Sequence, residues 1–263
     1  MLIIGEEINT SRPAVTEAVG KRDKQFIREM ARRQVEAGAD YLDVSAGTFL
    51  REEPECLRWL VETIQSEIKV PLCLTSNNPK ALSEAISRHE GEPMVNGVSL
   101  DPDHYALIVP VLASQPCTVV ALCSTGKTPP DSFKGRIEIG AKLIDKLTGY
   151  GFGTEKIYLD PCIQPAGMNS GLAITALEAL KEIKKRYPGL NTICGLSNIS
   201  FGLPRRRLIN STFLAMALSY GLTAAILNPL DPQLMATILA AEMILGRDHG
   251  CQRYIAAYQR GQV

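Results

Sequence analysis

Short apolar stretches alternate along the chain with longer segments in which apolar residues recur at helical spacing. Eight such stretches occur, each followed by a helix-like segment, so one strand and one helix repeat every roughly thirty residues. Strands that alternate with helices predict a parallel sheet, and eight units predict a TIM (β/α)8 barrel. The predicted strands are Leu2–Ile8, Tyr41–Gly47, Leu72–Asn77, Met94–Leu100, Cys117–Ser124, Lys156–Ile163, Thr192–Asn198 and Thr223–Leu230.

Helix boundaries are marked by residues with strong positional preferences. A first helix is expected over Pro13–Ala37, capped by Thr10 or Ser11 and closed by Gly38. A capping side chain directly before a proline marks several of the later starts, because proline is favoured at the first helical position. These later starts are predicted near Pro54, at Asn78-Pro79, at Asp101-Pro102, at Asn210-Ser211-Thr212 and at Asp231-Pro232.

No linker or low-complexity tract interrupts this pattern, so one domain over residues 1–263 is predicted. An open doubly wound sheet is the main architectural alternative. A dinucleotide-binding sheet places a G-x-G-x-x-G motif after its first strand. Here the first strand leads into Gly5-Glu6-Glu7-Ile8-Asn9-Thr10, which has no glycine cradle, and the barrel is favoured.

Composition and charge narrow the class of protein. Hydrophobic residues make up 45% and charged residues 21%, which are globular values. The 28 basic and 28 acidic residues give zero net charge, so bulk charge favours neither nucleic acid nor a membrane surface. No signal peptide or membrane span is expected. Seven cysteines without a C-x-x-C motif indicate reduced thiols and a soluble, cytoplasmic protein, and no metal site is expected.

Polar side chains gather at the downstream ends of the predicted strands, where active sites of TIM barrels lie. Asp160 ends an apolar strand, and a buried carboxylate needs a partner. A flat ligand edge with two parallel N–H groups would supply one, whereas a helix cap or an arginine pair is the structural alternative. Asn96 could bind a heterocycle or tie neighbouring strands together. The other polar residues at these ends are Glu6, Asn9, Asp43, Thr75, Asn77, Ser124, Ser197, Asn198 and Asn228.

Asn198 is the candidate for stabilising a changing charge. Its amide can donate to a neutral ring nitrogen or accept from a protonated one, although an asparagine here could simply turn the chain. Asp43 and Glu6 could bind a ligand or hold backbone N–H groups at the barrel rim. The run Arg205, Arg206 and Arg207 could grip an anionic ligand tail or an acidic partner, or it could be a solvated loop.

Two other features have a chemical and a structural interpretation. Cys123 and Cys162 are nucleophile candidates by position, although neither has a histidine nearby in sequence. The loop Thr128–Phe133 could bind an anion, but turn chemistry explains its Pro129-Pro130-Asp131-Ser132 sequence. Without an obvious internal nucleophile, the chain more naturally binds one reactant and presents it to another.

Three stretches resemble the pterin-binding methyltransferases that move a methyl group between tetrahydrofolate and a corrinoid. Gly5-Glu6 with Ile8-Asn9 is similar to the family's opening motif, and Tyr158-Leu159-Asp160-Pro161 is similar to its sixth-strand motif. The most specific stretch is Gly195–Gly202, followed by Leu208–Leu214. The likeness extends over nearly the whole chain. Dihydropteroate synthases share the barrel, but this seventh-strand signature is not associated with them.

The resemblance implies the roles of individual residues. Asn198 would face N5 of the pterin, where a proton or hydrogen bond turns the leaving group into a neutral amine. The cobalamin would be carried by a partner corrinoid protein, because the chain has no D-x-H-x-x-G motif, and a homodimer is implied. The substrate would be tetrahydrofolate or 5-methyltetrahydrofolate. The implied pterin contacts are Asp160, Asn96, Thr75, Asp43, Glu6 and Ser197.

Two positions depart from the family pattern. Thr75 stands where an aspartate is common, and Glu7 replaces the usual arginine of the opening motif. A hydroxyl at Thr75 cannot supply negative charge, which favours methyl transfer from methylcobalamin to tetrahydrofolate in a catabolic demethylation system. The alternatives are an anabolic transfer from 5-methyltetrahydrofolate to a corrinoid/iron-sulfur protein, a dihydropteroate synthase-like condensation, and a non-catalytic folate-binding subunit.

Overall fold

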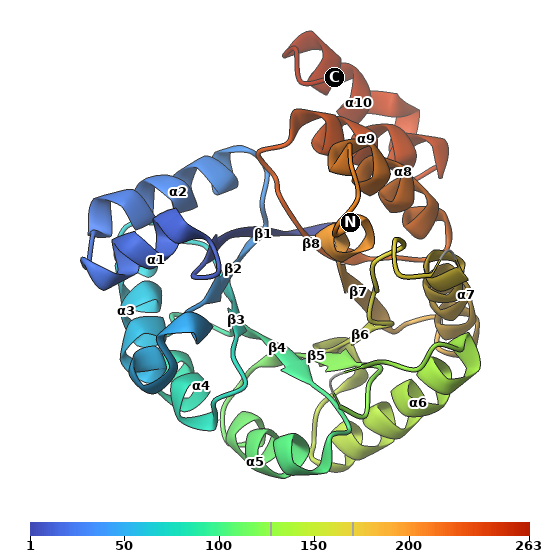
Figure 1. Ribbon diagram of the computed structural model, residues 1–263. Coiled ribbons are helices and arrows are strands. Elements are labelled where there is room, and N and C mark those ends of the chain that lie inside the picture. The colour runs from blue at the N-terminus through green and yellow to red at the C-terminus, as the bar shows by residue number, and fades with distance from the viewer. Residues whose placement is uncertain (127, 170) are drawn as a thin grey trace.

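Eight parallel strands close into a barrel in the computed structural model, which describes residues 1–126, 128–169 and 171–263 (Figure 1). Each strand pairs with its neighbours in sequence, and β8 pairs with β1 to complete the ring. The predicted TIM barrel is therefore confirmed. The strands are β1 (Leu2–Asn9), β2 (Tyr41–Ser45), β3 (Leu72–Thr75), β4 (Met94–Val98), β5 (Thr118–Leu122), β6 (Ile157–Asp160), β7 (Asn191–Gly195) and β8 (Ala224–Leu227).

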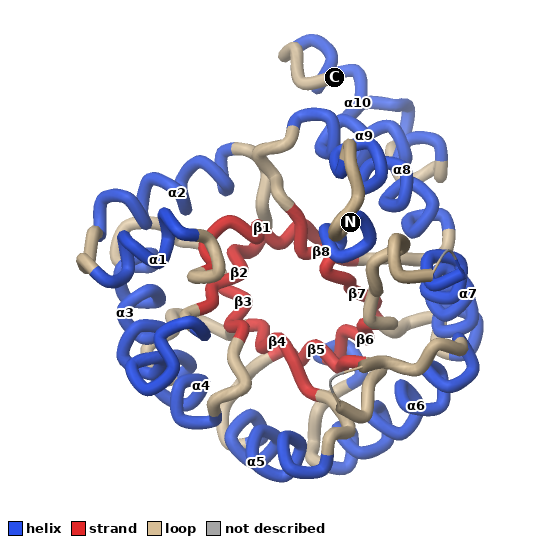
Figure 2. Tube along the Cα trace, viewed as in Figure 1, coloured by secondary structure: helices blue, strands red, loops and turns tan. Residues whose placement is uncertain are grey.

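Helices form an outer ring around the strands, and α10 stands away from the barrel beside α9 (Figures 1 and 2). Within the described ranges, no helix has both the length and the apolar character needed to cross a membrane. The α-helices are α1 (Pro13–Gly20), α2 (Lys24–Glu36), α3 (Glu53–Gln65), α4 (Pro79–Ile86), α5 (Pro102–Ala113), α6 (Phe133–Gly149), α7 (Gly171–Arg186), α8 (Arg206–Ser219), α9 (Pro232–Ile244) and α10 (Gln252–Gln259). Short 3-10 helices are η1 (Gly47–Glu52), η2 (Thr154–Lys156), η3 (Leu196–Ser200) and η4 (His249–Cys251).

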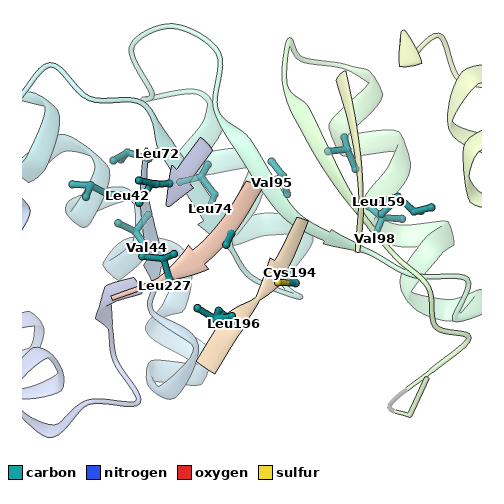
Figure 3. Close-up of a cluster of buried hydrophobic side chains, with 14 of the residues drawn as sticks. Leu42, Val44, Leu72, Leu74, Val95, Val98, Leu159, Cys194, Leu196 and Leu227 are labelled. Atoms are coloured by element: carbon teal, nitrogen blue, oxygen red, sulfur yellow. The ribbon is translucent and has the colours of Figure 1, made fainter. Parts of the chain in front are cut away.

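The core has two layers because successive side chains of a strand point to opposite faces. Outward side chains such as Leu42, Leu74 and Leu159 pack between the strands and the helices (Figure 3). Each such fully buried leucine contributes roughly 1.5–3 kcal/mol of transfer free energy. A smaller cluster fills the inside of the barrel, and its buried members are Ile4, Cys73, Met94, Val120, Ile193 and Ala224.

The same alternation builds a polar layer above that inner cluster. Two residues downstream of an inward apolar side chain, the next inward side chain lies at the C-terminal end of the strand. Ile4 is thus followed by Glu6, and Tyr158 by Asp160. Asp43, Thr75 and Asn96 follow Tyr41, Cys73 and Met94 in the same way. The fold therefore points the predicted polar residues toward one end of the barrel.

The expected single helix over Pro13–Ala37 is wrong, because the chain breaks between α1 and α2. Arg22 adopts a left-handed backbone conformation (φ 53°), which no α-helix accommodates. Asp23 then caps α2 by accepting a hydrogen bond from the N–H of Phe26. The predicted starts at Asn78, Asp101 and Asp231 are confirmed, since each side chain caps its helix.

The segment after the seventh strand also differs from expectation. The strand ends at Gly195, and Leu196–Ser200 forms η3, so Ser197 and Asn198 lie on a tight turn and not in the strand. α8 begins at Arg206, four residues before the expected start at Asn210. Asn210 therefore lies inside α8 and does not cap it. At the start of this helix, Arg206 donates hydrogen bonds to η3.

Candidate active site

A cavity of about 570 Å³ opens at the C-terminal ends of the strands, a size typical of small-molecule sites. A larger groove of about 880 Å³ lies outside the barrel between α2, α9 and α10, but none of the polar layer of the strands lines it. The cavity at the barrel mouth is therefore the candidate site. Its predicted lining residues are Glu6, Asp43, Thr75, Asn96, Ser197, Asn198, Arg206 and Arg207.

Three predicted residues form one hydrogen-bonded chain across β4, β3 and β2. The Asn96 amide nitrogen donates to the Thr75 hydroxyl (3.1 Å), and that hydroxyl donates to the Asp43 carboxylate. A hydroxyl has one proton. Because the Thr75 hydroxyl donates that proton to Asp43, it can only accept hydrogen bonds from other groups. Burial raises the pKa of Asp43 to about 6, against the opposing effect of the Thr75 hydrogen bond. The carboxylate absent from position 75 is thus supplied by Asp43 on the neighbouring strand.

Gly5 allows the first strand to pack closely against the side chain of Gln34 on α2. A Cβ at Gly5 would lie 2.4 Å from the side-chain oxygen of the buried Gln34, so only glycine allows this close approach. That oxygen accepts a hydrogen bond from the N–H of Glu7 (3.1 Å). The register between β1 and β2 shifts between Gly5 and Ile8, which marks a bulge. The bulge positions Glu6 at the mouth of the barrel.

Glu6 is held from two sides of the mouth. Its carboxylate accepts a hydrogen bond from the Ser197 hydroxyl (2.7 Å), and Arg12 lies 3.9 Å away. Burial raises the pKa of Glu6, while Ser197 and Arg12 act in the opposite direction. Arg12 also pairs with Glu7 (2.7 Å), so the positive charge missing at position 7 is supplied five residues later.

Asn198 lies on η3 with an exposed side chain lining the cavity. A Cβ at Gly195 would lie 3.1 Å from its amide nitrogen, so the glycine leaves space for this amide above the strand end. Arg206 fixes the turn from outside: it donates to the carbonyl oxygen of Ser197 (2.8 Å) and to the hydroxyl of Ser200 (3.0 Å). Asn198 therefore lies on a turn that the hydrogen bonds of Arg206 hold in place.

Asp160 belongs to the inward polar layer but is not among the residues lining the mouth cavity. Its side chain is 8% exposed, and one oxygen accepts a hydrogen bond from the N–H of Cys162 (2.6 Å). Burial raises the pKa of Asp160 to about 7, and the Cys162 N–H and the Arg136 charge lower it. The carboxylate retains acceptor capacity for a donor entering from above.

The arginine run divides into three different environments. Arg205 is exposed in a left-handed conformation (φ 51°) and does not line the cavity. Arg206 braces η3, and Arg207 lies 3.5 Å from a carboxylate oxygen of Asp231 at the start of α9. Only the latter two therefore reach the site. The arrangement favours a solvated role for Arg205.

Other polar candidates serve turns. The side chain of Asn9 accepts from the N–H of Ser11, and that of Asn228 accepts from the N–H of Leu230, although both residues also line the cavity. Asn77 is exposed outside the cavity lining. Ser124 bonds to the backbone of Gly126. These contacts are the local bonds that Asn and Ser side chains make in turns.

The thiol alternatives are disfavoured by the environment. Burial raises the pKa of both Cys123 and Cys162, so neither is a thiolate near neutral pH. Ser132 caps α6 by accepting a hydrogen bond from the N–H of Gly135, which agrees with turn chemistry for the loop Thr128–Phe133. No group of three or more His, Cys, Asp or Glu side chains in the described ranges is arranged to hold a metal ion.

Sequence reasoning missed three residues of this region. Arg12 lies in the loop after the first strand, and the sequence pattern predicts only a helix cap at Asn210. Asn210 lines the cavity, and its buried side-chain oxygen has no hydrogen-bond partner among the residues described. Arg136 is the third: it lies on α6 with no exposed surface and binds the loops after β5 and β6. In the sequence, an arginine on the apolar face of the 133–149 helix is the feature that indicates a buried, hydrogen-bonded cation.

Residues 5–228 match the family described as pterin binding enzyme. The chain is 30% identical over 265 residues to the methylcorrinoid:tetrahydrofolate methyltransferase of Eubacterium limosum, covering all of this chain and 98% of that protein. It is 28% identical to the methionine synthase of Mycobacterium tuberculosis, over 87% of this chain but 20% of that longer protein. A full-length relative and a segment of a larger enzyme thus share this sequence pattern.

Solved structures of dihydropteroate synthases share the fold. The enzyme of Yersinia pestis in a sulfonamide complex superimposes with a TM-score of 0.75 at 15% identity, covering 93% of this chain and 94% of that one. The enzyme of Vibrio fischeri superimposes with a TM-score of 0.73 at 15% identity, covering 94% and 93%. At such identities the likeness extends to the barrel alone.

Proposed function

This chain belongs to the pterin binding enzymes, and we propose that it transfers a methyl group from a methylated corrinoid protein to N5 of tetrahydrofolate. The single observation that carries the proposal is the inward polar layer, in which Asn96, Thr75 and Asp43 form one chain beneath the turn bearing Asn198. The full-length likeness to a methylcorrinoid:tetrahydrofolate methyltransferase supports the same activity and direction.

The residues present fit a pterin ring. A pterin offers an amino group and an adjacent ring N–H as two parallel donors, and a carboxylate with a free oxygen accepts such a pair. Asp160 has that capacity, since the single N–H of Cys162 uses one acceptor site. Asn96 keeps its carbonyl oxygen and a second N–H for the heterocycle, because only one N–H goes to Thr75.

The chain must also manage one proton. The corrinoid partner supplies the methyl group and keeps the electron pair of the cobalt–carbon bond, while N5 gains the methyl group and loses its proton. The Asn198 amide can accept a hydrogen bond from N5–H as positive charge develops there. Asp43, with a pKa of about 6, can receive a proton through the Thr75 hydroxyl, which accepts one proton as it passes its own to Asp43.

The rival functions make other demands on the mouth. A dihydropteroate synthase-like condensation needs several free cations for a pyrophosphate leaving group. At this mouth Arg12 pairs with Glu7 and Arg206 binds η3, which leaves Arg207, an exposed side chain 3.5 Å from Asp231. The similarity to the synthases lies below 20% identity and extends to the fold. A non-catalytic folate-binding subunit would share the pocket but would not turn over.

Turnover separates these possibilities. Purified protein is mixed anaerobically with methylcobalamin and tetrahydrofolate, and the cobalamin spectrum is followed as the methyl–cobalt bond is lost. We expect catalysed loss of methylcobalamin with matching formation of 5-methyltetrahydrofolate. Absence of methyl movement in both directions, with free and with protein-bound corrinoid, rejects the enzyme. The anabolic alternative is favoured if only transfer from 5-methyltetrahydrofolate proceeds.

We further infer that two copies pair through α9 and α10. Ile244 is 77% exposed and Tyr258 69% exposed, and Met235 and Leu239 line the groove beside α2. A protruding helix next to a groove can be self-complementary about a twofold axis. Light scattering on wild type and on Ile244→Glu tests this interface, because the variant should become monomeric. The seven free thiols support a reducing, cytoplasmic location.

A further inference from the structure

Arg136 is a buried cation whose hydrogen-bond partners are neutral. Its side chain on α6 has 0% exposure. The guanidinium donates to the carbonyl oxygens of Pro130 (2.8 Å), Pro161 (2.8 Å) and Cys162 (2.9 Å), and to the side-chain oxygen of Gln164. Burying a charge is costly unless every donor is satisfied, so a residue serving only to fill space would be better replaced by an apolar one.

Two of these bonds bracket the backbone of Cys162. Cys162 has φ 61°, a left-handed conformation that costs a non-glycine residue on the order of 1 kcal/mol. In this conformation its N–H donates to the Asp160 carboxylate at 2.6 Å. The carbonyl oxygens on either side of that N–H, those of Pro161 and Cys162, are both held by the same guanidinium nitrogen. Arg136 thereby stabilises the backbone geometry on which the Asp160 hydrogen bond depends.

We propose that Arg136 is the positioning residue of Asp160: it holds the Cys162 N–H against the carboxylate and places near it a positive charge that favours the ionised form. The proposal rests on the proposed function only in taking Asp160 as a pterin contact. Arg136 itself touches no substrate in this scheme, since it lies beneath the loops that follow β5 and β6.

The ionisable surroundings of Asp160 identify Arg136 as the relevant charge. The thiols of Cys123, Cys162 and Cys194 all interact with Asp160, and burial raises the pKa of each, so they stay neutral through the physiological range. Asp131 interacts with Arg136. Burial raises the pKa of Asp160 and the Arg136 charge opposes that rise. Arg136 remains protonated although burial lowers its pKa.

Close packing of α6 brings the guanidinium to this place. Gly140 lies one turn after Arg136, and a Cβ there would be 2.8 Å from the Leu159 side chain and 3.2 Å from the Cys123 sulfur. The helix therefore approaches β5 and β6 more closely than a larger residue would allow. The Arg136 side chain reaches the loop after β6 without exposure to solvent.

The test measures Asp160 directly in the protein without ligand. Carboxyl carbons of aspartate are labelled with 13C, and the Asp160 resonance, assigned with Asp160→Asn, is titrated by NMR in wild type and in Arg136→Met. We expect the variant to raise the Asp160 pKa by about one unit, which is the effect of losing a nearby opposite charge. Gln164→Ala is the matched control, because it removes one loop contact of Arg136 and leaves its three carbonyl bonds intact.

A second variant and a binding measurement complete the test. Arg136→Lys keeps the charge but cannot hold both carbonyls in a fork, so it should weaken tetrahydrofolate binding severalfold at high pH with a smaller pKa change. In Arg136→Met this loss of positioning should persist at high pH, and binding should weaken by up to about a further tenfold as pH falls below the wild-type pKa of Asp160. The proposal is overturned if Asp160 titrates as in wild type in Arg136→Met or, where only Arg136→Lys folds, if that variant binds tetrahydrofolate as tightly as wild type at high pH. Because the titration needs no ligand, it is independent of whether methyl transfer is observed.

Discussion

Single residues divide the proposed reaction into holding the pterin and stabilising its reactive nitrogen. Asp160 lies deep in the inward layer and Asn198 lies above the cavity on η3. Replacing Asn198 by alanine should lower kcat about a hundredfold with little change in the Kd for tetrahydrofolate, because its hydrogen bond forms as charge develops. Replacing Asp160 by alanine should raise Kd about a hundredfold. Single-turnover rates and calorimetric binding distinguish these effects, with the exposed Asn77→Ala as control.

Equal losses of rate and affinity in the two variants would contradict this division of roles. So would an intact Kd in the Asp160 variant. The two residues lie on different elements, β6 and η3, so their effects should add if they act independently.

The hydroxyl of Thr75 carries the proton connection to Asp43. Thr75→Val keeps the shape but removes that connection, so transfer should slow about tenfold or more while tetrahydrofolate still binds. The pKa of Asp43 should rise in this variant, because the Thr75 hydrogen bond lowers it. The residual rate should no longer depend on Asp43 ionisation, so the acid limb of the pH–rate profile should flatten. Thr75→Ser retains a hydroxyl and should retain the wild-type rate and profile. A Thr75→Val enzyme with unchanged pH dependence would remove Asp43 from the proton path.

At the scale of elements, η3 is the part of the barrel rim whose position depends on a neighbouring helix. Arg206, at the start of α8, donates to Ser197 and Ser200, whereas the adjacent Arg205, which is also exposed, does not line the cavity. Arg206→Ala should therefore lower kcat at least tenfold through displacement of Asn198. Arg205→Ala is its matched control and should leave kcat unchanged. Equal kcat values in both variants would show that η3 holds its position without Arg206.

Strands and caps were predictable because they depend on local sequence. The apolar alternation that ends in Asp43 or Asp160 identifies an inward strand terminus, and Asn78 or Asp231 before proline identifies a helix start. The break at Arg22 was not predictable, because apolar periodicity continues on both sides of it and only the left-handed backbone interrupts the helix.

Contacts between distant segments could not be read from the sequence either. Gln34 fits against Gly5 across 29 positions, and Arg136 holds Cys162 across 26. A glycine or a buried arginine marks such a place but does not name its partner. The sequence and the resemblance name Asp160 and Asn198 as candidates, whereas the contacts that Arg136 and Arg206 make beside them depend on three-dimensional packing.

At the scale of the whole molecule, the buried carboxylates of the mouth should make stability depend on pH. Burial raises the pKa of Asp43 to about 6 and that of Asp160 to about 7, above the ordinary value near 3.8. Between the ordinary value and these raised values, the folded protein binds more protons than the unfolded chain. Stability therefore falls as pH rises through this window and levels off above about 7. The candidate site thus opposes folding most strongly at the pH at which its carboxylates are ionised.

Asp160→Asn tests this linkage, because the amide keeps the shape and can still accept the Cys162 N–H. Above neutral pH the variant should be more stable than wild type by on the order of 2 kcal/mol, or about 5 °C in Tm. The difference should shrink toward zero as pH falls toward the ordinary aspartate value. Calorimetric scans across this range measure it, with the exposed Asp145→Asn as control. A stability difference that is constant with pH would mean that Asp160 titrates normally. A pH-dependent gain in stability together with loss of folate binding would show that the buried carboxylate lowers stability but is needed to bind the ligand.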